Sequence, residues 1–306
     1  MEKKKNNPAK ISSISQFHDL LKLPKPLHPM VSLIDNTQLV ISEDLANYAF
    51  LLDLYKISYK FSTNGKMGYG QGFYDFNEGG LLFSSPNQLI FTENEEGAEY
   101  GGYTLLFHPD FIRNYPLGKN IKKYGFFSYD TNEALHLSDS EKTIIIGLLN
   151  SIDTELRNAI DEMSQDVIVS YIDVLLNYSN RFYKRQFITR KTISHDLLIK
   201  VEETLDNYIN NAETLKEGLP TVDFLASKIN VSTHYLSDML RNLTGQNTQQ
   251  HIHSKLIEKS KDFLITTDLS VAEIAYQLGF EYPQSFSKLF KKKTNLTPLE
   301  FKNSLN

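Results

Sequence analysis

The chain has 306 residues, enough for two domains that each bury a core of their own. Its 32 Lys and Arg against 37 Asp and Glu give a net charge of −5, which by itself argues against a strongly basic nucleic-acid binder. The absence of cysteine excludes disulfides, thiolate metal sites and cysteine nucleophiles. No apolar run approaches the ~18 residues of a membrane span and none follows the basic start, so we expect a cytoplasmic protein without membrane contact.

Residues 1–28 are interpreted as an N-terminal arm. Its first 15 residues are polar and lysine-rich at the front, which is typical of a loose segment. Within the arm, SISQFHDLL at 13–21 predicts a short helix, and the prolines of LPKPLHP separate this helix from the first predicted strand.

Residues 29–137 predict a small antiparallel β barrel or sandwich, because short apolar and aromatic runs alternate with turn signals such as Asn64-Gly65. Some of their aromatic side chains are candidates to line an effector pocket at the barrel mouth, with ordinary barrel core as the alternative for each. These candidates are Tyr59, Phe61, Tyr69, Phe73 and Phe83. No paired His-x-His with a downstream Glu and His is present, so we expect no metal and no other cofactor.

Residues 138–184 predict a pair of helices. Ser138 and Glu141 have the spacing of a capping box, and an apolar stripe follows at helical spacing. A second amphipathic helix begins near Ser164. Two such helices can pair as an antiparallel hairpin, and their surplus apolar surface makes them a candidate dimerisation element for a homodimer.

Residues 185–195 are interpreted as the linker between domains. The composition changes here, with five basic residues in the eleven positions from Arg181 to Lys191. The remaining residues, 196–306, form the second predicted domain.

The second domain contains an internal repeat, because residues 225–252 align with residues 274–301. Each copy has the pattern of a helix-turn-helix unit: a small Ala, a turn residue that tolerates the left-handed conformation, and apolar positions on a second helix. Ser232 can cap the second helix of the first copy, and Pro283 suits the first turn of the corresponding helix in the other copy. The intervening stretch TQQHIHSKLIEKSKDFLIT predicts a rigid connecting helix.

Residues 219–306 resemble the DNA-binding domain of the AraC/XylS family of bacterial transcription regulators, and SVAEIAYQLGFEYPQSFSKLFKKKTNLTPLEF is similar to the family signature. This segment has ten basic and eight acidic residues, a local charge of +2. The departures are Asn295, where the family commonly has Gly, and Phe301-Lys302, where it has Tyr-Arg. The resemblance implies an α+β protein in which a cupin-like N-terminal barrel and a helical pair precede an all-α domain with tandem helix-turn-helix units.

The same resemblance implies the DNA-binding residues. Base-facing positions would be His234, Ser237, Asp238 and Arg241 in the first unit and Pro283, Gln284, Ser287 and Lys288 in the second. Their chemistry allows this, since Gln can pair with adenine, Lys and Arg with guanine, and Asp can accept from cytosine. We expect phosphate contacts from Thr233, Lys291 and Lys292.

Together these features predict a sequence-specific regulator of double-stranded promoter DNA that works with RNA polymerase as an activator, although the sequence leaves repression open. Control by a small effector in the β domain and control by dimerisation or a protein partner both remain alternatives. A cupin enzyme with a DNA-binding appendage is the weakest hypothesis, because the strands offer mostly Tyr, Phe, Ser and Gly.

Overall fold

The computed structural model describes residues 9–39, 49–62, 67–69, 72–74, 79–91, 100–130, 133–159, 161–189, 191–211 and 213–304. The chain is of mixed α+β class and divides into two compact units, residues 1–186 and 187–306. Within the described residues, no helix is both long enough and apolar enough to span a bilayer.

The first unit contains the strands. Their bounds are β1 Ala9–Ile11, β2 Val31–Asp35, β3 Ala49–Leu52, β4 Tyr55–Ser62, β5 Met67–Tyr69, β6 Gly72–Tyr74, β7 Gly80–Ser84, β8 Gln88–Phe91, β9 Tyr100–Phe107 and β10 Leu135–His136. They form a five-stranded sheet of order β10-β7-β4-β9-β2, a three-stranded sheet of order β1-β3-β8 and the β5-β6 hairpin. The described strands therefore make three separate sheets and do not close into one barrel among themselves.

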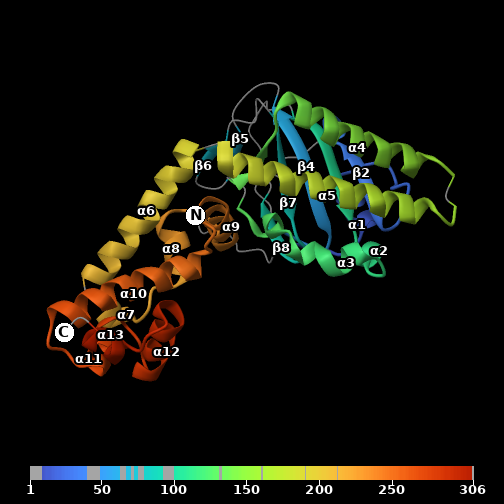
Figure 1. The fold of residues 1–306 in the computed structure, drawn as a ribbon. Helices are drawn as coiled ribbons and strands as arrows, with labels where there is room; N and C mark the ends of the chain where they lie inside the picture. Colours follow the sequence, from blue (N-terminus) through green and yellow to red (C-terminus); the bar gives the residue numbers. More distant parts are fainter. Residues whose placement is uncertain are drawn as a thin grey trace. The chain divides into compact units, whose positions relative to one another are not determined.

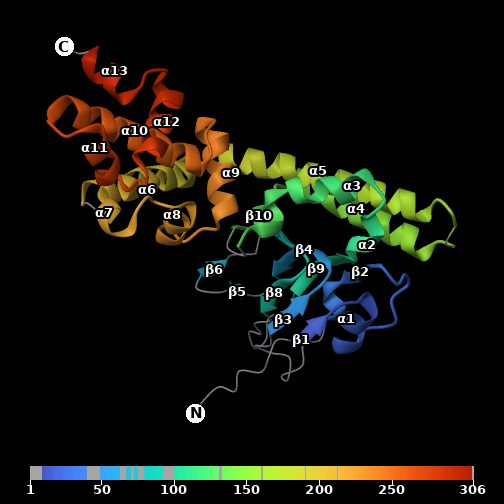
Figure 2. The ribbon, with the colours of Figure 1, turned by 90° about the horizontal axis from the view of Figure 1, so that it is seen from below.

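The two faces of the five-stranded sheet have different partners, because side chains alternate along each strand. On one face, Tyr55 of β4 stacks on Phe107, with ring centroids 5.1 Å apart, and its ring meets that of Phe127 edge-on at a centroid distance of 5.2 Å. Helices α4 (Asp139–Arg157) and α5 (Ser164–Thr189) cover this face in both ribbon views (Figures 1 and 2). On the other face, Leu106 and Ile34 join a buried apolar cluster with residues of β1, β3 and α1 (Ile14–Leu20).

Part of the predicted N-terminal arm is built into this unit. The predicted short helix is confirmed as α1, which is capped by the Ser13 hydroxyl. Residues Ala9–Ile11 form β1, which runs parallel to β3 and was not predicted as a strand. Ile11 and Ile14 are buried, so apolar burial against the three-stranded sheet holds this segment in place.

The predicted helical pair is confirmed, including its start. Ser138 accepts a hydrogen bond from the Glu141 N–H, and the Glu141 carboxylate accepts one from the Ser138 N–H, which completes the capping box of α4. The apolar stripes predicted at helical spacing are largely buried in the structure. Ile145, Leu149 and Ile152 of α4 lie on the buried side, with Leu175 and Leu176 of α5.

Two residues of the predicted 185–195 linker are anchored in the first unit. Arg185 donates to the Glu141 carboxylate from Nε at 3.0 Å and from Nη2 at 2.6 Å, and Nη2 also donates to the His136 carbonyl. Gln186 is buried and bonds the backbone of His136 and Ala134. The unit boundary falls at residues 186 and 187, and α5 and α6 (Lys191–Asn210) extend over the predicted linker on either side of residue 190. Composition could not reveal this, because the charge of Arg185 is neutralised by a residue 44 positions away.

The remaining helices complete the two units. The first unit also contains α2 Pro109–Ile112 and α3 Pro116–Asn120. The second contains α6 together with α7 Glu213–Glu217, α8 Val222–Lys228, α9 Thr233–Thr244, α10 Thr248–Thr266, α11 Val271–Gln277, α12 Pro283–Thr294 and α13 Pro298–Asn303.

The Arg185–Glu141 pair yields a stability prediction. Replacing Arg185 with Met should lower the free energy of unfolding by about 1–3 kcal/mol, because the Glu141 carboxylate, only 12% exposed, loses its cation. The matched control is Arg157→Met, which removes an exposed intrahelical pair with Asp153 and should cost about 0.5 kcal/mol or less. Urea unfolding followed by circular dichroism measures both variants. Equal losses would show that the pair does not anchor α5 to α4.

Candidate nucleic-acid interface

The second unit contains two helix-turn-helix units with nearly the same local geometry. In the first, α8 leads through a tight turn into α9, and in the second α11 leads into α12. The predicted turn residues Asn230 and Gly279 have φ of 57° and 87°, both in the left-handed region. Backbone bonds that close the turns also correspond, from Val231 N to Ala226 O (3.1 Å) and from Phe280 N to Ala275 O (2.9 Å).

The repeat continues beyond the second helix of each copy. Thr244 and Thr294, 50 residues apart, each donate from the hydroxyl to the carbonyl four residues earlier, at 2.8 Å. Left-handed caps follow at Gly245 and Asn295, so the Asn that departs from the family pattern keeps the turn.

A capping box then starts the next helix in each copy. Asn247 pairs with Gln250 at the start of α10, and Thr297 pairs with Glu300 at the start of α13. The sequence-based predictions missed both boxes, although the N-x-x-Q and T-x-x-E spacings are readable from the chain.

Helix α10 connects the two copies, as predicted, and packs against both. Ile252, Leu256 and Leu264 are buried on it. In its first turn, the Thr248 hydroxyl shares a hydrogen bond of 3.0 Å with the Ser237 hydroxyl of α9. Farther along α10, the Ser254 hydroxyl accepts a hydrogen bond from Lys293 of α12. In Figure 1, α9 and α12 lie on either side of the first half of α10.

Helix α6 supports α10 from another side. Lys255 of α10 binds Asp206 of α6 at 2.9 Å, and this hydrogen bond raises the pKa of Lys255. Lys259 donates to Asn210 at 2.8 Å. Sequence patterns did not reveal these contacts, because they join residues about 49 positions apart that no short motif connects.

The predicted base-facing residues of α9 differ in solvent exposure. His234 and Arg241 are exposed, whereas Ser237 is partly buried and shares a hydrogen bond with Thr248. Arg241 binds Asp238 at 2.9 Å within the helix. This ion pair offsets the negative charge of Asp238, which would otherwise repel phosphates. Thr233, at the first helical position, is partly buried.

Helix α12 presents a more basic surface than α9. It contains four lysines and no acidic residue, and Gln284, Lys288, Lys291 and Lys292 are all exposed. Pro283 occupies the first turn, as predicted. Pro283 and Ser287 are partly buried, while Phe286 and Phe290 are fully buried on the opposite face. Lys288, Lys291 and Lys292 can therefore meet an anionic ligand without disturbing the core.

Two histidines of α10 lie close to this lysine cluster. Burial lowers the pKa of His251 and His253, and the charge of Lys293 acts in the same direction on both. Their rings bond to neutral groups, His251 to the Thr244 hydroxyl at 2.7 Å and His253 to the Gln249 amide at 2.9 Å. Both are thus neutral near pH 7, and the positive charge of this surface comes from lysine.

Comparisons with known proteins agree with this geometry. Residues 225–304 match a family described as a helix-turn-helix domain. The chain is 26% identical to the regulatory protein SoxS of Escherichia coli strain K12 over 118 residues, which are 39% of this chain and 100% of SoxS. Residues 225–304 are thus a helix-turn-helix domain of the AraC type.

Two further relatives show how far the similarity extends. An HTH-type transcriptional regulator from the cgkA 5' region of Pseudoalteromonas carrageenovora is 32% identical over 101 residues, which are 33% of this chain and 55% of that relative. The chain therefore spans only about half the length of that relative. YfiF of Bacillus subtilis strain 168, also named as an HTH-type transcriptional regulator, is 23% identical over 257 residues, 81% of this chain and 76% of YfiF.

Of the candidate effector-binding aromatics, Tyr59 and Phe83 have side chains that the structure describes. The ring centroid of Phe83 lies 4.4 Å from that of Phe126 and 6.2 Å from that of Tyr183 of α5. Burial raises the pKa of Tyr59. Two charges of α4 also act on this pKa, Lys142 lowering it and Asp139 raising it. Tyr59 and Phe83 therefore lie on the helix-covered face of the sheet rather than on the face toward β1 and β3. The side chains of Phe61, Tyr69 and Phe73 lie outside the described residues.

Gly279 meets a second constraint besides its φ. A Cβ added there would lie 2.7 Å from the Gly218 carbonyl carbon, so the second turn packs directly on the backbone that precedes α8. Tyr208 donates to the Gly218 carbonyl, and Thr214 of α7 donates to the Gln277 carbonyl at the end of α11. These contacts join the second helix-turn-helix copy to α7 and to the residues before α8, independently of α10.

The contact with Gly218 predicts that substitution at Gly279 and at Gly245, which both have a left-handed φ, has different effects on stability. Gly279→Asn should lower the free energy of unfolding by about 1–3 kcal/mol, because the new side chain overpacks against Gly218. Gly245→Asn should change it by about 0.5 kcal/mol or less, since nothing lies within 4 Å of its added Cβ and Asn295 holds the corresponding position. Thermal denaturation compares the two variants. A similar loss in both would mean that φ alone, and not the contact with Gly218, requires glycine at 279.

Proposed function

We propose that this chain reads promoter DNA with α9 and α12 in successive major-groove segments. The observation that carries this proposal is the packing of α10 against both helix-turn-helix copies, which holds the two helices in a fixed relation. Recognition helices of such motifs enter major-groove segments about 34 Å apart on one face of the DNA.

The two helices divide the work in this proposal. Helix α12, with four lysines and no carboxylate, supplies most of the attraction to phosphates through Lys291 and Lys292, while Gln284 and Lys288 contact base edges. Pro283 and Ser287 line the same side. On α9, His234 and Arg241 contact DNA, Thr233 approaches a phosphate, and Asp238 orients Arg241.

Control of DNA binding belongs to the first unit in this proposal. A small effector bound in the β-rich, cupin-like part is one form of control, and footprinting on DNA flanking the chain's own gene, with and without candidate metabolites, tests it. A footprint that no metabolite alters would count against the effector. In either form the regulator works in the cytoplasm with RNA polymerase.

Dimerisation is the second form of control, and a specific surface favours it. Helix α5 presents Val167, Tyr171, Val174 and Tyr178 at helical spacing, and Val174 is 40% exposed. On α4, Ile144 is 36% exposed, and a Cβ added at Gly147 would meet open space. Two partly exposed apolar stripes on one pair of helices suit a subunit interface.

The proposed division of contacts on α12 predicts different losses for two lysines. Lys288→Ala should relax discrimination at one or two base pairs, each worth about 1–3 kcal/mol. Lys291→Ala should weaken binding to all sequences alike and reduce the salt slope by about 1. Titrations on specific and scrambled duplexes at several salt concentrations measure both effects. Uniform loss in both variants would remove Lys288 from base readout.

The apolar stripe on α5 predicts a dimer that polar substitution separates. Val174→Glu should convert a folded dimer into a folded monomer, because it places a charge within the proposed interface, whereas Asn150→Glu, at an exposed position of α4 outside the proposed stripes, should not. The monomer should bind paired DNA sites more weakly, since it loses the effective concentration of the second arm. Sedimentation of folded protein decides the matter, and a wild-type monomer at micromolar concentration would refute the dimer.

A further inference from the structure

Strand β4 lies at the centre of the five-stranded sheet, between β7 and β9, and its side chains alternate between the two faces. Tyr55 and Tyr59 lie on the face that α4 and α5 cover. Lys56, Ser58 and Lys60 therefore lie on the other face, toward β1, β3 and α1. Ser58 is only 1% exposed, so this second face is covered as well. Lysine is an unusual residue for such a face, because it is almost never fully buried without a partner.

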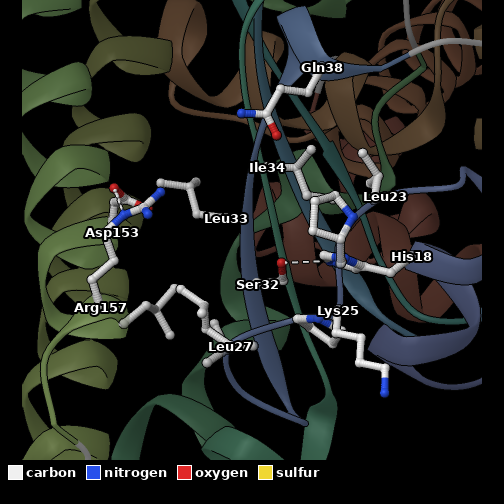
Figure 3. Close-up of a pocket in the computed structure, with 14 residues that line it drawn as sticks. His18, Leu23, Lys25, Leu27, Ser32, Leu33, Ile34, Gln38, Asp153 and Arg157 are labelled. Carbon is white, nitrogen blue, oxygen red and sulfur yellow. Dashed lines mark hydrogen bonds and ion pairs between the residues drawn. The ribbon is translucent and has the colours of Figure 1, made fainter.

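The register of the sheet places Lys56 beside the apolar core. Lys56 pairs with Leu106 of β9 and with Ser84 of β7, and Leu106 pairs in turn with Ser32 of β2. These four residues form one row across the sheet, so their side chains share a face. Leu106 is fully buried in the apolar cluster that includes residues of β1, β3 and α1. Figure 3 shows Ser32 directed toward His18 of α1, which agrees with this direction.

The neutral polar groups of this face satisfy one another. The Ser58 hydroxyl shares a hydrogen bond of 3.1 Å with the Thr104 hydroxyl, and Thr104 donates to the Asn36 side-chain oxygen at 2.8 Å. The Asn36 amide donates in turn to the Tyr59 carbonyl at 3.2 Å. All three side chains are buried, so this chain of hydrogen bonds forms a polar strip between apolar neighbours.

Lys56 differs from these neutral groups. It is partly buried, and among the residues that the structure describes no hydrogen bond or ion pair reaches its ammonium group. Burial lowers the pKa of Lys56 to about 7, and the positive charge of Lys60 acts in the same direction. A buried charge without a counter-charge costs stability. A residue kept at such a cost is a candidate for binding rather than for packing.

The surroundings of Lys56 indicate what supplies the counter-charge. Two lysines on one face repel cations, and a lysine ammonium binds carboxylate and phosphate groups as a point charge. Because the neighbouring Ser58 and Leu106 are covered by the rest of the unit, DNA and protein surfaces do not reach them. Lys56 itself is only partly buried, so a small molecule can reach its ammonium group.

We propose that Lys56 binds the carboxylate or phosphate group of a small organic anion on the face of the five-stranded sheet that lies toward β1 and β3. This anion is the effector of the first unit. The regulatory role rests on the proposed control of DNA binding by a small effector, whereas binding of the anion does not depend on DNA.

The test compares three full-length chains: the wild type, Lys56→Met and Lys122→Met. Methionine keeps the unbranched stem of Lys56 and removes its charge, and Lys122, an exposed lysine of the same unit, is the matched control. Thermal denaturation is followed by circular dichroism at about pH 6.5, where Lys56 is mostly protonated. The probes are pyruvate and benzoate as carboxylates, inorganic phosphate and glycerol 3-phosphate as phosphates, and glycerol and sodium chloride at matched ionic strength as controls.

Without any probe, Lys56→Met should unfold about 2 °C or more above the wild type, because it removes an uncompensated charge from a covered face. A lysine that holds the fold together would give the opposite sign. A Lys56→Met chain that is less stable than the wild type, or that does not fold, would therefore overturn the proposal. Lys122→Met should unfold with the wild type, since its charge is exposed.

With the probes, at least one carboxylate or phosphate should raise the unfolding midpoint of the wild type and of Lys122→Met by about 2 °C or more, with saturation. The same anion should leave Lys56→Met unchanged. The preferred probes identify the ligand as a carboxylate or a phosphate. An equal rise in all three chains, or no rise dependent on Lys56 with any anion, would refute the site.

A DNA titration separates this site from the proposed function. Fluorescence anisotropy on a specific duplex is measured for the wild type and Lys56→Met, with and without the anion that stabilises the wild type. We expect the anion to change the DNA affinity of the wild type alone, by about threefold or more. If the anion stabilises the wild type through Lys56 but leaves DNA affinity unchanged, the anion site stands and effector control is wrong. If DNA binding is specific but no anion acts through Lys56, the regulator stands and the anion site is wrong.

Discussion

The DNA-binding unit depends on the packing of one helix, α10, against both helix-turn-helix copies. Its 19 residues span about 28 Å at the usual rise per residue, a length comparable to one turn of DNA. The buried face of α10 contacts the helices of each copy, and α6 supports it through Lys255 and Lys259. A change that loosens α10 would therefore alter the relation of α9 to α12 without touching either helix.

The two copies have the same backbone design but different surfaces. Both use a left-handed turn residue, a threonine network at the helix end and a capping box, so the same local bonds hold both helices. Their outward charges differ, because Arg241 is paired with Asp238 on α9 while the lysines of α12 face no carboxylate on their own helix. Within one motif, the backbone is thus the same in both copies, whereas electrostatics distinguishes them.

The first unit has a five-stranded sheet with a well-packed aromatic face. Tyr55 of β4 and Phe83 of β7 pack against aromatic side chains of α5 and of the residues before β10. Strand β2 lies at the edge of the five-stranded sheet and pairs with β9 alone among the described strands.

The local features of this protein could be predicted from its sequence. The starts of α1, α4, α9 and α12, and the left-handed turns at Asn230 and Gly279, depend on a few neighbouring residues, so caps, periodicity and turn chemistry suffice to find them. The repeat was visible because both copies use the same local chemistry. Tertiary structure alone decided the rest: Arg185 pairs with Glu141, Gly279 packs on Gly218, and β1 joins β3. Each of these contacts joins segments far apart in the chain. Likewise, the alternation of side chains along β4 shows that the strand has two faces, but it does not show which face the helices cover. Such contacts are set by the packing of whole elements, which no short run of sequence encodes.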